Sequence, residues 1–180
     1  MRGYIEELKK HDNKFIVATP SDFGNNLTVS KIKHFVLSHK LDVVAIDGVS
    51  YLADERFRRG DTEAQKLTHL GEDLWALTRD IHVPILIVAQ ANRSGAIDKE
   101  SEETPEVESV RGGDGLSLNA SKIISLKQNS DGVLIMQVKK QRGGVVGTKI
   151  SYQWSPDVGE FIGSQPQVTR PKKKIKEKRR

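Results

Sequence analysis

Two runs of apolar residues, within 41–47 and 85–89, limit the folds open to this chain. Each has the length of a strand, is rich in β-branched residues and lacks the apolar–polar alternation of a half-exposed strand. Between them, apolar residues at intervals of three and four predict a long amphipathic helix over 61–81: Leu67, Leu70, Leu74, Leu77 and Ile81. A buried strand, a helix and a second buried strand predict a parallel pair covered on both faces, with a right-handed crossover.

Weaker patterns predict the remaining elements. An apolar run at 14–18 has the size of a buried strand, and helical spacing over 29–37 follows Thr28, a residue type that favours the N-cap. Residues 94–115 are polar, acidic and glycine-containing, which predicts a mobile loop. Strands are predicted at 123–126, 133–138 and 145–154, with a hairpin at 129–132. The fold class predicted is α/β, with a largely parallel sheet flanked by helices and ending in antiparallel strands.

The composition excludes several classes of protein. The 180-residue sequence contains no cysteine, so neither a disulfide scaffold nor a thiolate metal site is available. No apolar run approaches the roughly 18 residues of a membrane span, and the N-terminus lacks the apolar stretch of a signal peptide. These features are compatible with a cytoplasmic protein.

The positive charge is concentrated at the C-terminus. The net charge is +5, but residues 170–180 hold eight Lys or Arg and one Glu, which is +7, so the other 169 residues sum to −2. We expect residues 1–164 to form the folded domain and residues 165–180 to form a basic, disordered tail. The tail fits either of two roles, attraction to phosphate backbones or simple solubilisation.

Asp47 stands at the carboxyl end of the first buried run. Ligands bind at that edge of open parallel sheets, and Mg²⁺ takes one or two carboxylates while it keeps several waters. An apolar strand that ends in Asp is the Walker B pattern of a Mg²⁺–nucleotide site, although an Asp that caps a turn gives the same pattern. The companion phosphate loop, Gly-x-x-x-x-Gly-Lys-Ser/Thr, does not occur in the sequence. The nearest string, 143–149, has its Lys and Thr reversed and leads into a predicted strand, so we reject it as a phosphate loop.

Four blocks in a fixed order resemble one protein family. They are residues 41–52, residues 83–93, residues 110–115 with 119–124, and residues 139–148. Over residues 14–162, their order and spacing resemble the C-terminal half of the motor domain of the DnaB-type replicative helicases of bacteria and phages. The resemblance implies a RecA-like fold that is incomplete at its N-terminal side, because the phosphate loop and catalytic glutamate of this family precede such a segment. A split or interrupted gene and a truncated sequence both fit this expectation.

The resemblance also implies roles for single residues. Asp47 would hold Mg²⁺ through water, and Gln90 would sense the γ-phosphate of ATP. Lys140 and Arg142 would form the pair that each subunit inserts into the ATP site of its neighbour. The DNA-binding residues implied are Arg93, Arg111, Gly112, Gly113 and Gly115. A second basic loop, facing DNA, a neighbour or solvent, holds Arg56, Arg58 and Arg59. Structural alternatives stay open: a polar strand end for Gln90, a flexible loop for the glycines and a basic turn for Lys140 and Arg142.

The function implied is that of an ATP- and Mg²⁺-dependent helicase that translocates on single-stranded DNA and unwinds duplex. Its partners would be further copies in a homo-hexamer or the rest of the motor, together with primase and a helicase loader, in the cytoplasm of a bacterium or a phage-infected cell. We expect the chain alone not to hydrolyse ATP. Two other classes stay open, a non-catalytic module that binds single-stranded DNA and a relative of the RecA recombinases or clock-type ATPases. The Lys-Gln-Arg-Gly block at 140–143 favours the helicase over the latter.

Overall fold

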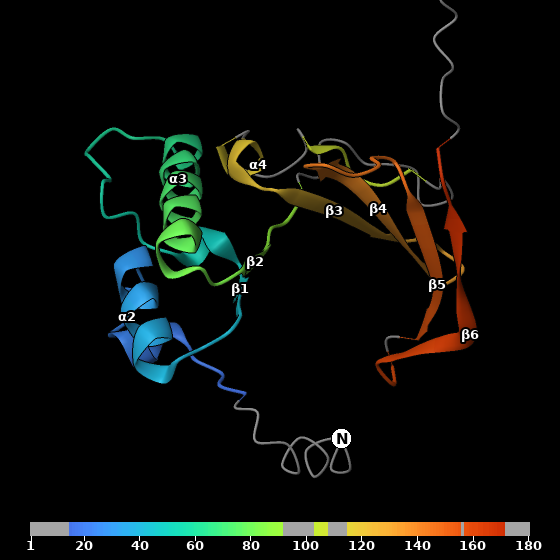
Figure 1. The fold of residues 1–180 in the computed structure, drawn as a ribbon, viewed down its shortest axis with the longest axis horizontal. Helices are drawn as coiled ribbons and strands as arrows, with labels where there is room; N and C mark the ends of the chain where they lie inside the picture. The colour runs from blue at the N-terminus through green and yellow to red at the C-terminus, as the bar shows by residue number, and fades with distance from the viewer. Residues whose placement is uncertain (1–14, 92–102, 108–114, 156, 172–180) are drawn as a thin grey trace, which may run out of the picture.

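A computed structural model describes residues 15–91, 103–107, 115–155 and 157–171, with the backbone alone described in 162–167. In chain order the elements are η1 (Pro20–Phe23), α2 (Val29–His39), β1 (Val44–Asp47), η2 (Val49–Tyr51), α3 (Glu63–Ile81), β2 (Ile85–Val88), α4 (Gly115–Asn119), β3 (Lys122–Gln128), β4 (Val133–Gln141), β5 (Lys149–Ser155) and β6 (Glu160–Thr169). Figure 1 shows two halves: α2, α3, β1 and β2 lie on one side, strands β3 to β6 on the other, and α4 between them at the top. None of the described helices is long and apolar enough to cross a membrane.

β1 and β2 form the parallel pair that the sequence predicts. Their register aligns Val44 with Ile85 and Asp47 with Val88, and α3 is the helix between them in the chain. Alternate side chains of the pair, among them Ile46 and Ile87, pack against the helical core. This arrangement places the carboxyl ends of both strands at one edge, where the candidate site lies.

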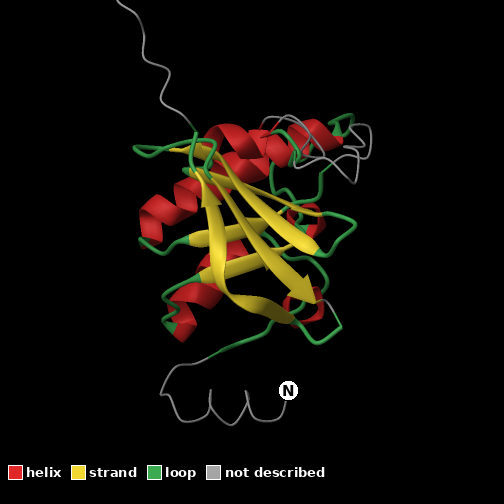
Figure 2. Ribbon diagram, turned by 90° about the vertical axis from the view of Figure 1, so that its right-hand side faces the viewer, coloured by secondary structure: helices red, strands yellow, loops and turns green. Residues whose placement is uncertain are grey.

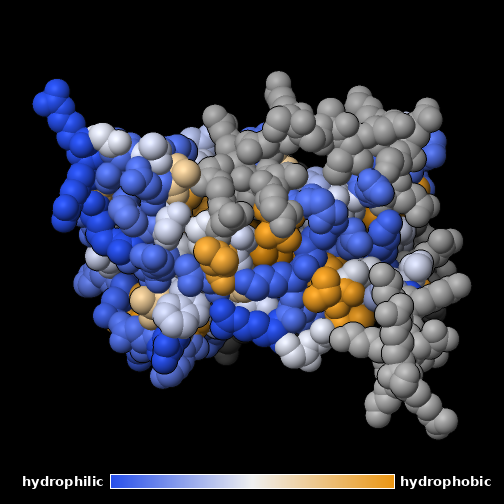
Figure 3. Space-filling model, turned by 90° about the horizontal axis from the view of Figure 1, so that it is seen from above, coloured by the Kyte–Doolittle hydropathy of each residue, from blue (hydrophilic) through white to orange (hydrophobic). Residues whose placement is uncertain are grey.

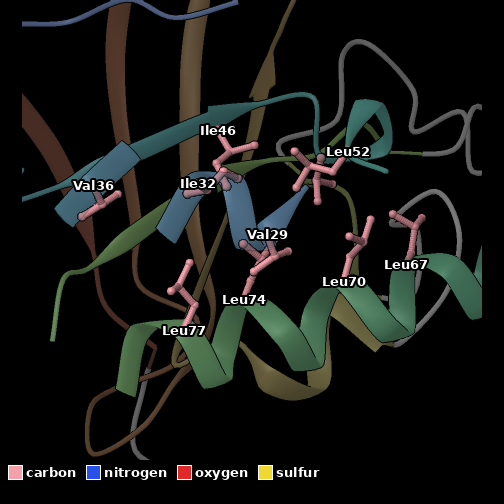
Figure 4. Packing of buried hydrophobic residues seen from close by; sticks show 10 residues of the cluster. Val29, Ile32, Val36, Ile46, Leu52, Leu67, Leu70, Leu74 and Leu77 are labelled. Carbon is pink, nitrogen blue, oxygen red and sulfur yellow. The ribbon is translucent and has the colours of Figure 1, made fainter. Parts of the chain in front are cut away.

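The core lies between α2, α3 and β1. Leu70 is 0% exposed, and burial of a Leu side chain contributes roughly 1.5–3 kcal/mol. Figure 4 shows the buried cluster, with side chains of α3 directed at those of α2, Ile46 and Leu52. The members of the cluster are Val29, Ile32, Val36, Ile46, Val49, Leu52, Leu67, Leu70, Leu74 and Leu77. The predicted stripe of α3 is therefore the centre of this core.

Capping residues set the ends of both long helices. The Thr28 hydroxyl accepts a hydrogen bond from the backbone N–H of Lys31, which confirms the predicted N-cap of α2. Thr62 and Gln65 form a capping box at the start of α3. That helix ends at Ile81, and its C-cap residue His82 has a φ of +54°, where the chain leaves the helical conformation.

Strands β3, β4, β5 and β6 form an antiparallel sheet in that order. The predicted hairpin between β3 and β4 is confirmed: the side chain of Asn129 accepts hydrogen bonds from the backbone of Asp131 and Val133, and Gly132 has φ +77°. Figure 2 shows the four strands in front of the helical layer. The string 143–149 leads into strand β5 and not into a helix, which confirms its rejection as a phosphate loop.

The two faces of the four-stranded sheet differ in whether other residues pack on them. One face is packed by residues 103–107: Thr104 donates to Gln137, Ser125 donates to the Pro105 carbonyl, and Ile135 is 3% exposed. The opposite face, called the open face below, is lined by Ile124, Leu126, Leu134, Met136, Val138, Ile150, Tyr152, Trp154, Phe161 and Val168. None of these side chains is buried, and Leu126 is 56% exposed. Seen from above, apolar atoms also reach the surface between hydrophilic ones (Figure 3).

The structure corrects four expectations. Residues 15–18 of the apolar run at 14–18 form no strand, and Phe15 is 80% exposed, because no described strand pairs with them. The parallel pair is covered on one face only, since Leu86 is 63% and Val88 50% exposed. Strand β6 continues to Thr169, so the domain boundary expected at 164 is too early. Within 94–115, residues 103–107 are bound to the sheet; 94–102 and 108–114 lie outside the described residues.

Candidate functional site at the strand edge and the β4–β5 turn

Asp47 and Gln90 lie at the same edge of the parallel pair. Asp47 is the last residue of β1 and aligns with Val88, the last residue of β2, so Gln90 follows two residues beyond that edge. Both side chains are exposed. An exposed carboxylate and an exposed amide at the carboxyl edge of parallel strands can face one ligand together.

The turn after Asp47 requires glycine. Gly48 has φ +79°, and a Cβ there would lie 2.6 Å from the ring of Tyr51. The next residues form η2, whose Ser50 carbonyl accepts a hydrogen bond of 2.7 Å from the ammonium of Lys66 on α3. Sequence reasoning missed Lys66, which no motif marks. This lysine fixes the backbone just after Asp47 to the long helix.

The donor set at this edge suits Mg²⁺ bound mostly by water. Mg²⁺ prefers octahedral oxygen ligands and commonly takes one or two carboxylates together with waters and phosphate oxygens. In the part of the chain that the structure describes, no group of three or more His, Asp or Glu side chains is placed to hold a metal ion. Asp47 fits as a single carboxylate ligand or as a partner of metal-bound water.

The turn between β4 and β5 carries the second candidate group. Strand alternation directs Lys139 and Lys140 to opposite sides: Lys139 pairs with Glu106 at 2.6 Å on the covered face, with its side chain 9% exposed. Lys140 donates to the carbonyls of Ser117 and Leu118 at 2.7 and 2.9 Å. Among the described residues, Arg142 has one hydrogen bond, in which its backbone N–H donates to the Ser121 carbonyl at 3.0 Å.

The Arg142 guanidinium is exposed and has no hydrogen-bond or ion-pair partner among the described residues. The turn beyond it is glycine-rich, and Gly143 and Gly147 have φ of +76° and +89°. Within the described ranges, no hydrogen bond or ion pair joins this turn to Asp47 or Gln90. No described hydrogen bond or ion pair therefore connects the two candidate groups within one copy.

The predicted DNA-binding residues fall mainly outside the described residues. Arg93, Arg111, Gly112 and Gly113 belong to that group. Gly115 is described and buried, where it packs on α3: a Cβ at this position would lie 2.3 Å from Cα of Thr68. The sequence did not predict this packing contact.

The second basic loop is partly bound to α3. The Arg56 guanidinium bonds the His69 carbonyl at 2.8 Å and Glu72 at 2.9 Å, and lies 3.3 Å from Asp73. Burial lowers the pKa of Arg56, but the hydrogen bond and the acidic neighbours raise it above its ordinary value. Arg56 is therefore engaged in the fold, while the side chains of Arg58 and Arg59 are exposed.

Asp54 anchors the same loop from inside. Its side chain is fully buried and accepts hydrogen bonds from the Arg56 backbone at 2.8 Å and from Nδ1 of His69 at 2.7 Å. Burial raises the pKa of Asp54, but the two hydrogen bonds and the positive charges of His69 and Arg56 outweigh burial and hold this pKa below its usual value. The loop is thus held by an ionised carboxylate.

Comparisons with known proteins give the family and the fold. The family model described as the DnaB-like helicase C terminal domain matches residues 4–162. The crystal structure of the RadB recombinase is similar to this chain, with a TM-score of 0.51 and 17% identity over 78% of this chain and 60% of the RadB chain. The chain thus spans less than two thirds of the RadB structure. That likeness shows an α/β fold of the RecA type. No curated protein matches the chain.

Proposed function

Because the chain belongs to the family of DnaB-like helicase C-terminal domains, we propose that it is part of an ATP-driven motor that translocates on single-stranded DNA and unwinds duplex. In this proposal its copies work in a homo-hexamer, in the cytoplasm of a bacterium or a phage-infected cell. Primase and a helicase loader are the further partners.

The carboxyl edge of the parallel pair is the observation that carries the proposal. Asp47 and Gln90 follow neighbouring strands there, and both are exposed. Asp47 would hold Mg²⁺ and its waters, and the Gln90 amide would hydrogen-bond the γ-phosphate. Bound Mg²⁺ would neutralise phosphate charge during phosphoryl transfer.

Arg142 is the group proposed to act in a neighbouring subunit. Its exposed guanidinium, free of partners in the described part of the chain, can enter the ATP site of another copy. An arginine supplied in this way contributes about 10³–10⁵ to kcat in phosphoryl transfer. Lys140 is the second member of the proposed pair, and its ammonium must leave the carbonyls of Ser117 and Leu118 to reach a phosphate.

Single-stranded DNA is proposed to run along the segment that precedes α4. Its contacts would come from Arg93, Arg111, Gly112 and Gly113, whereas Gly115, also expected to bind DNA, is buried against α3. Backbone N–H groups of glycines approach phosphates closely, and phosphate contacts of this kind position DNA without reading its sequence.

The open face and β2 are proposed to receive the phosphate-loop part of the motor. Among the described strands, β2 pairs with β1 alone, and Leu86 and Val88 are exposed on it. The described side chains that line the open face come from all four strands and none of them is charged, which suits a protein strand and an amphipathic helix and not a nucleic acid.

A fusion of this chain to the phosphate-loop segment of a DnaB-like helicase tests the function. We expect ATP hydrolysis that single-stranded DNA stimulates, and loss of hydrolysis in Asp47→Asn. Leu126→Asp on the open face should lower activity, whereas Leu37→Asp, at an α2 position 55% exposed, should not. A fusion that folds but hydrolyses no ATP would overturn the proposal.

The runner-up function is a non-catalytic module that holds single-stranded DNA. The basic residues 170–180, with eight Lys or Arg and one Glu, favour it, because such a segment attracts phosphate backbones. It predicts that the chain binds an oligo(dT) probe equally well with and without ATP and Mg²⁺. The motor proposal predicts instead that DNA affinity of the fusion changes with the bound nucleotide.

A further inference from the structure

The short helix α4 is the joint between the two halves of the molecule. It begins at Gly115 and ends at Asn119, and it packs on α3 on one side and leads into β3 on the other (Figure 1). Among the described elements, α3 and α4 make the extensive contact that links the helical half to the four-stranded half. A contact that holds α4 against the strands therefore also holds the helical half and the four-stranded half in a fixed relative position.

The α3 side of the joint leaves no free space. A Cβ on Gly71 would lie 2.7 Å from the Gly115 carbonyl oxygen, and a Cβ on Gly115 would lie 2.3 Å from Cα of Thr68. These neighbours are backbone atoms, which cannot rotate away as a side chain can. The two backbones are thus in direct contact, so α4 packs on α3 at one fixed distance.

The strand side of the joint depends on Lys140. The last carbonyls of a helix have no partner inside the helix, and a cation near a helix C-terminus is favourable. The ammonium of Lys140 on β4 donates to two of these carbonyls, those of Ser117 and Leu118, at 2.7 and 2.9 Å. Its side chain is half-buried. Lys139 does not share this contact, because it pairs with Glu106.

The geometry points to Lys140 as a positioning residue that acts within its own chain. By capping α4, it holds the four-stranded half, and with it Arg142, at a fixed place relative to the edge that carries Asp47 and Gln90. This role goes beyond the proposed function and requires neither ATP nor DNA. A chain in which the cap is lost should keep both halves folded but let them move against each other.

Distance measurement between two spin labels tests this role. The sequence contains no cysteine, so Leu37→Cys on α2 and Ser130→Cys in the β3–β4 turn can be labelled selectively. We expect one narrow distance peak in the parent chain and loss of that peak in Lys140→Met, which keeps the stem but removes the donors. Lys140→Arg should retain the peak, and the control Lys139→Met should leave it unchanged.

Two outcomes would overturn the inference: an unchanged narrow peak in Lys140→Met, or loss of the peak in Lys140→Arg as well. Circular dichroism must show that Lys140→Met is folded. If it is not, nuclear magnetic resonance of the parent chain decides, because a hydrogen-bonded Lys140 ammonium exchanges its protons slowly and a fast-exchanging one refutes the cap. Neither readout involves ATP or DNA, so failure of the helicase proposal is distinguishable from failure of this one.

Discussion

Gly115→Ala should destabilise the protein because the added methyl group has no space. Its Cβ would lie 2.3 Å from Cα and Oγ1 of Thr68, whereas ordinary contact begins at 3.4 Å, so backbone must move by about 1.1 Å. Gly115 does not have a positive φ, so the alanine backbone itself is unstrained. Overpacking of this kind costs about 1–3 kcal/mol. For a protein of this size the expected fall in Tm is about 2–12 °C.

Thermal and urea unfolding, followed by circular dichroism, measure this cost. Gly144→Ala is the matched control, because its Cβ would meet only the flexible side chain of Gln141, which can rotate away. The control should lie within about 0.5 kcal/mol of the parent chain. If Gly115→Ala is as stable as the parent, or more stable, then α4 is not seated on α3 as described.

Three further perturbations have definite expected outcomes. Leu70→Ala, at 0% exposure, should lower the free energy of unfolding by about 2–5 kcal/mol in urea titrations, and Leu37→Ala, 55% exposed, should change it by less than about 0.5 kcal/mol. The lowered pKa of Asp54 contributes stability above the ordinary Asp pKa of about 4, and this stability is lost as pH falls through the folded-state pKa. Asp54→Asn should therefore be less stable at pH 6, and its free energy of unfolding should fall less steeply as the pH is lowered. An equally steep fall in the variant and the parent chain would contradict this. Removal of residues 170–180 should weaken oligo(dT) binding and reduce its salt dependence, and an unchanged slope in fluorescence anisotropy excludes a role for the tail.

Local patterns predicted the elements that depend on local physics. The stripe from Leu67 to Leu77, the Thr28 cap and the turn at Asn129 specify their structures from side-chain spacing and hydrogen-bonding groups within a few residues. The parallel pairing of β1 and β2 followed because two buried apolar runs are joined by a helix. These are the parts of the fold that the sequence predicts well.

Long-range contacts decided the parts that sequence reasoning missed. The run at 14–18 has the composition of a strand, but a strand needs a paired neighbour, and residues 15–18 have none among the described strands. Lys66, which holds the Ser50 carbonyl, and Lys140, which caps α4, both contact residues at least 16 positions away in sequence. No periodicity or motif reports such pairs, so their roles became visible only in three dimensions.

The sequence predicts which residue types form the candidate site better than it predicts their contacts. The sequence placed Asp47 and Gln90 after neighbouring strands, and the parallel register puts them at one edge. It treated Lys140 and Arg142 as equivalent, whereas the ammonium of Lys140 is bound to α4 and only the guanidinium of Arg142 extends into solvent without a described partner. The difference arises from the α4 carbonyls, which no pattern around residues 140–142 reveals.

Mixing two inactive variants tests the central claim, that one copy completes the ATP site of another. In the fusion that carries the phosphate loop, Asp47→Asn removes the proposed Mg²⁺ residue and Arg142→Ala removes the proposed finger, and we expect each alone to lose about 10³-fold or more of its hydrolysis rate. In rings mixed at equal amounts, about a quarter of the interfaces pair an intact Asp47 site with an intact Arg142. The mixture should regain ATP hydrolysis. A mixture as inactive as its components, or full activity of Arg142→Ala alone, would contradict it.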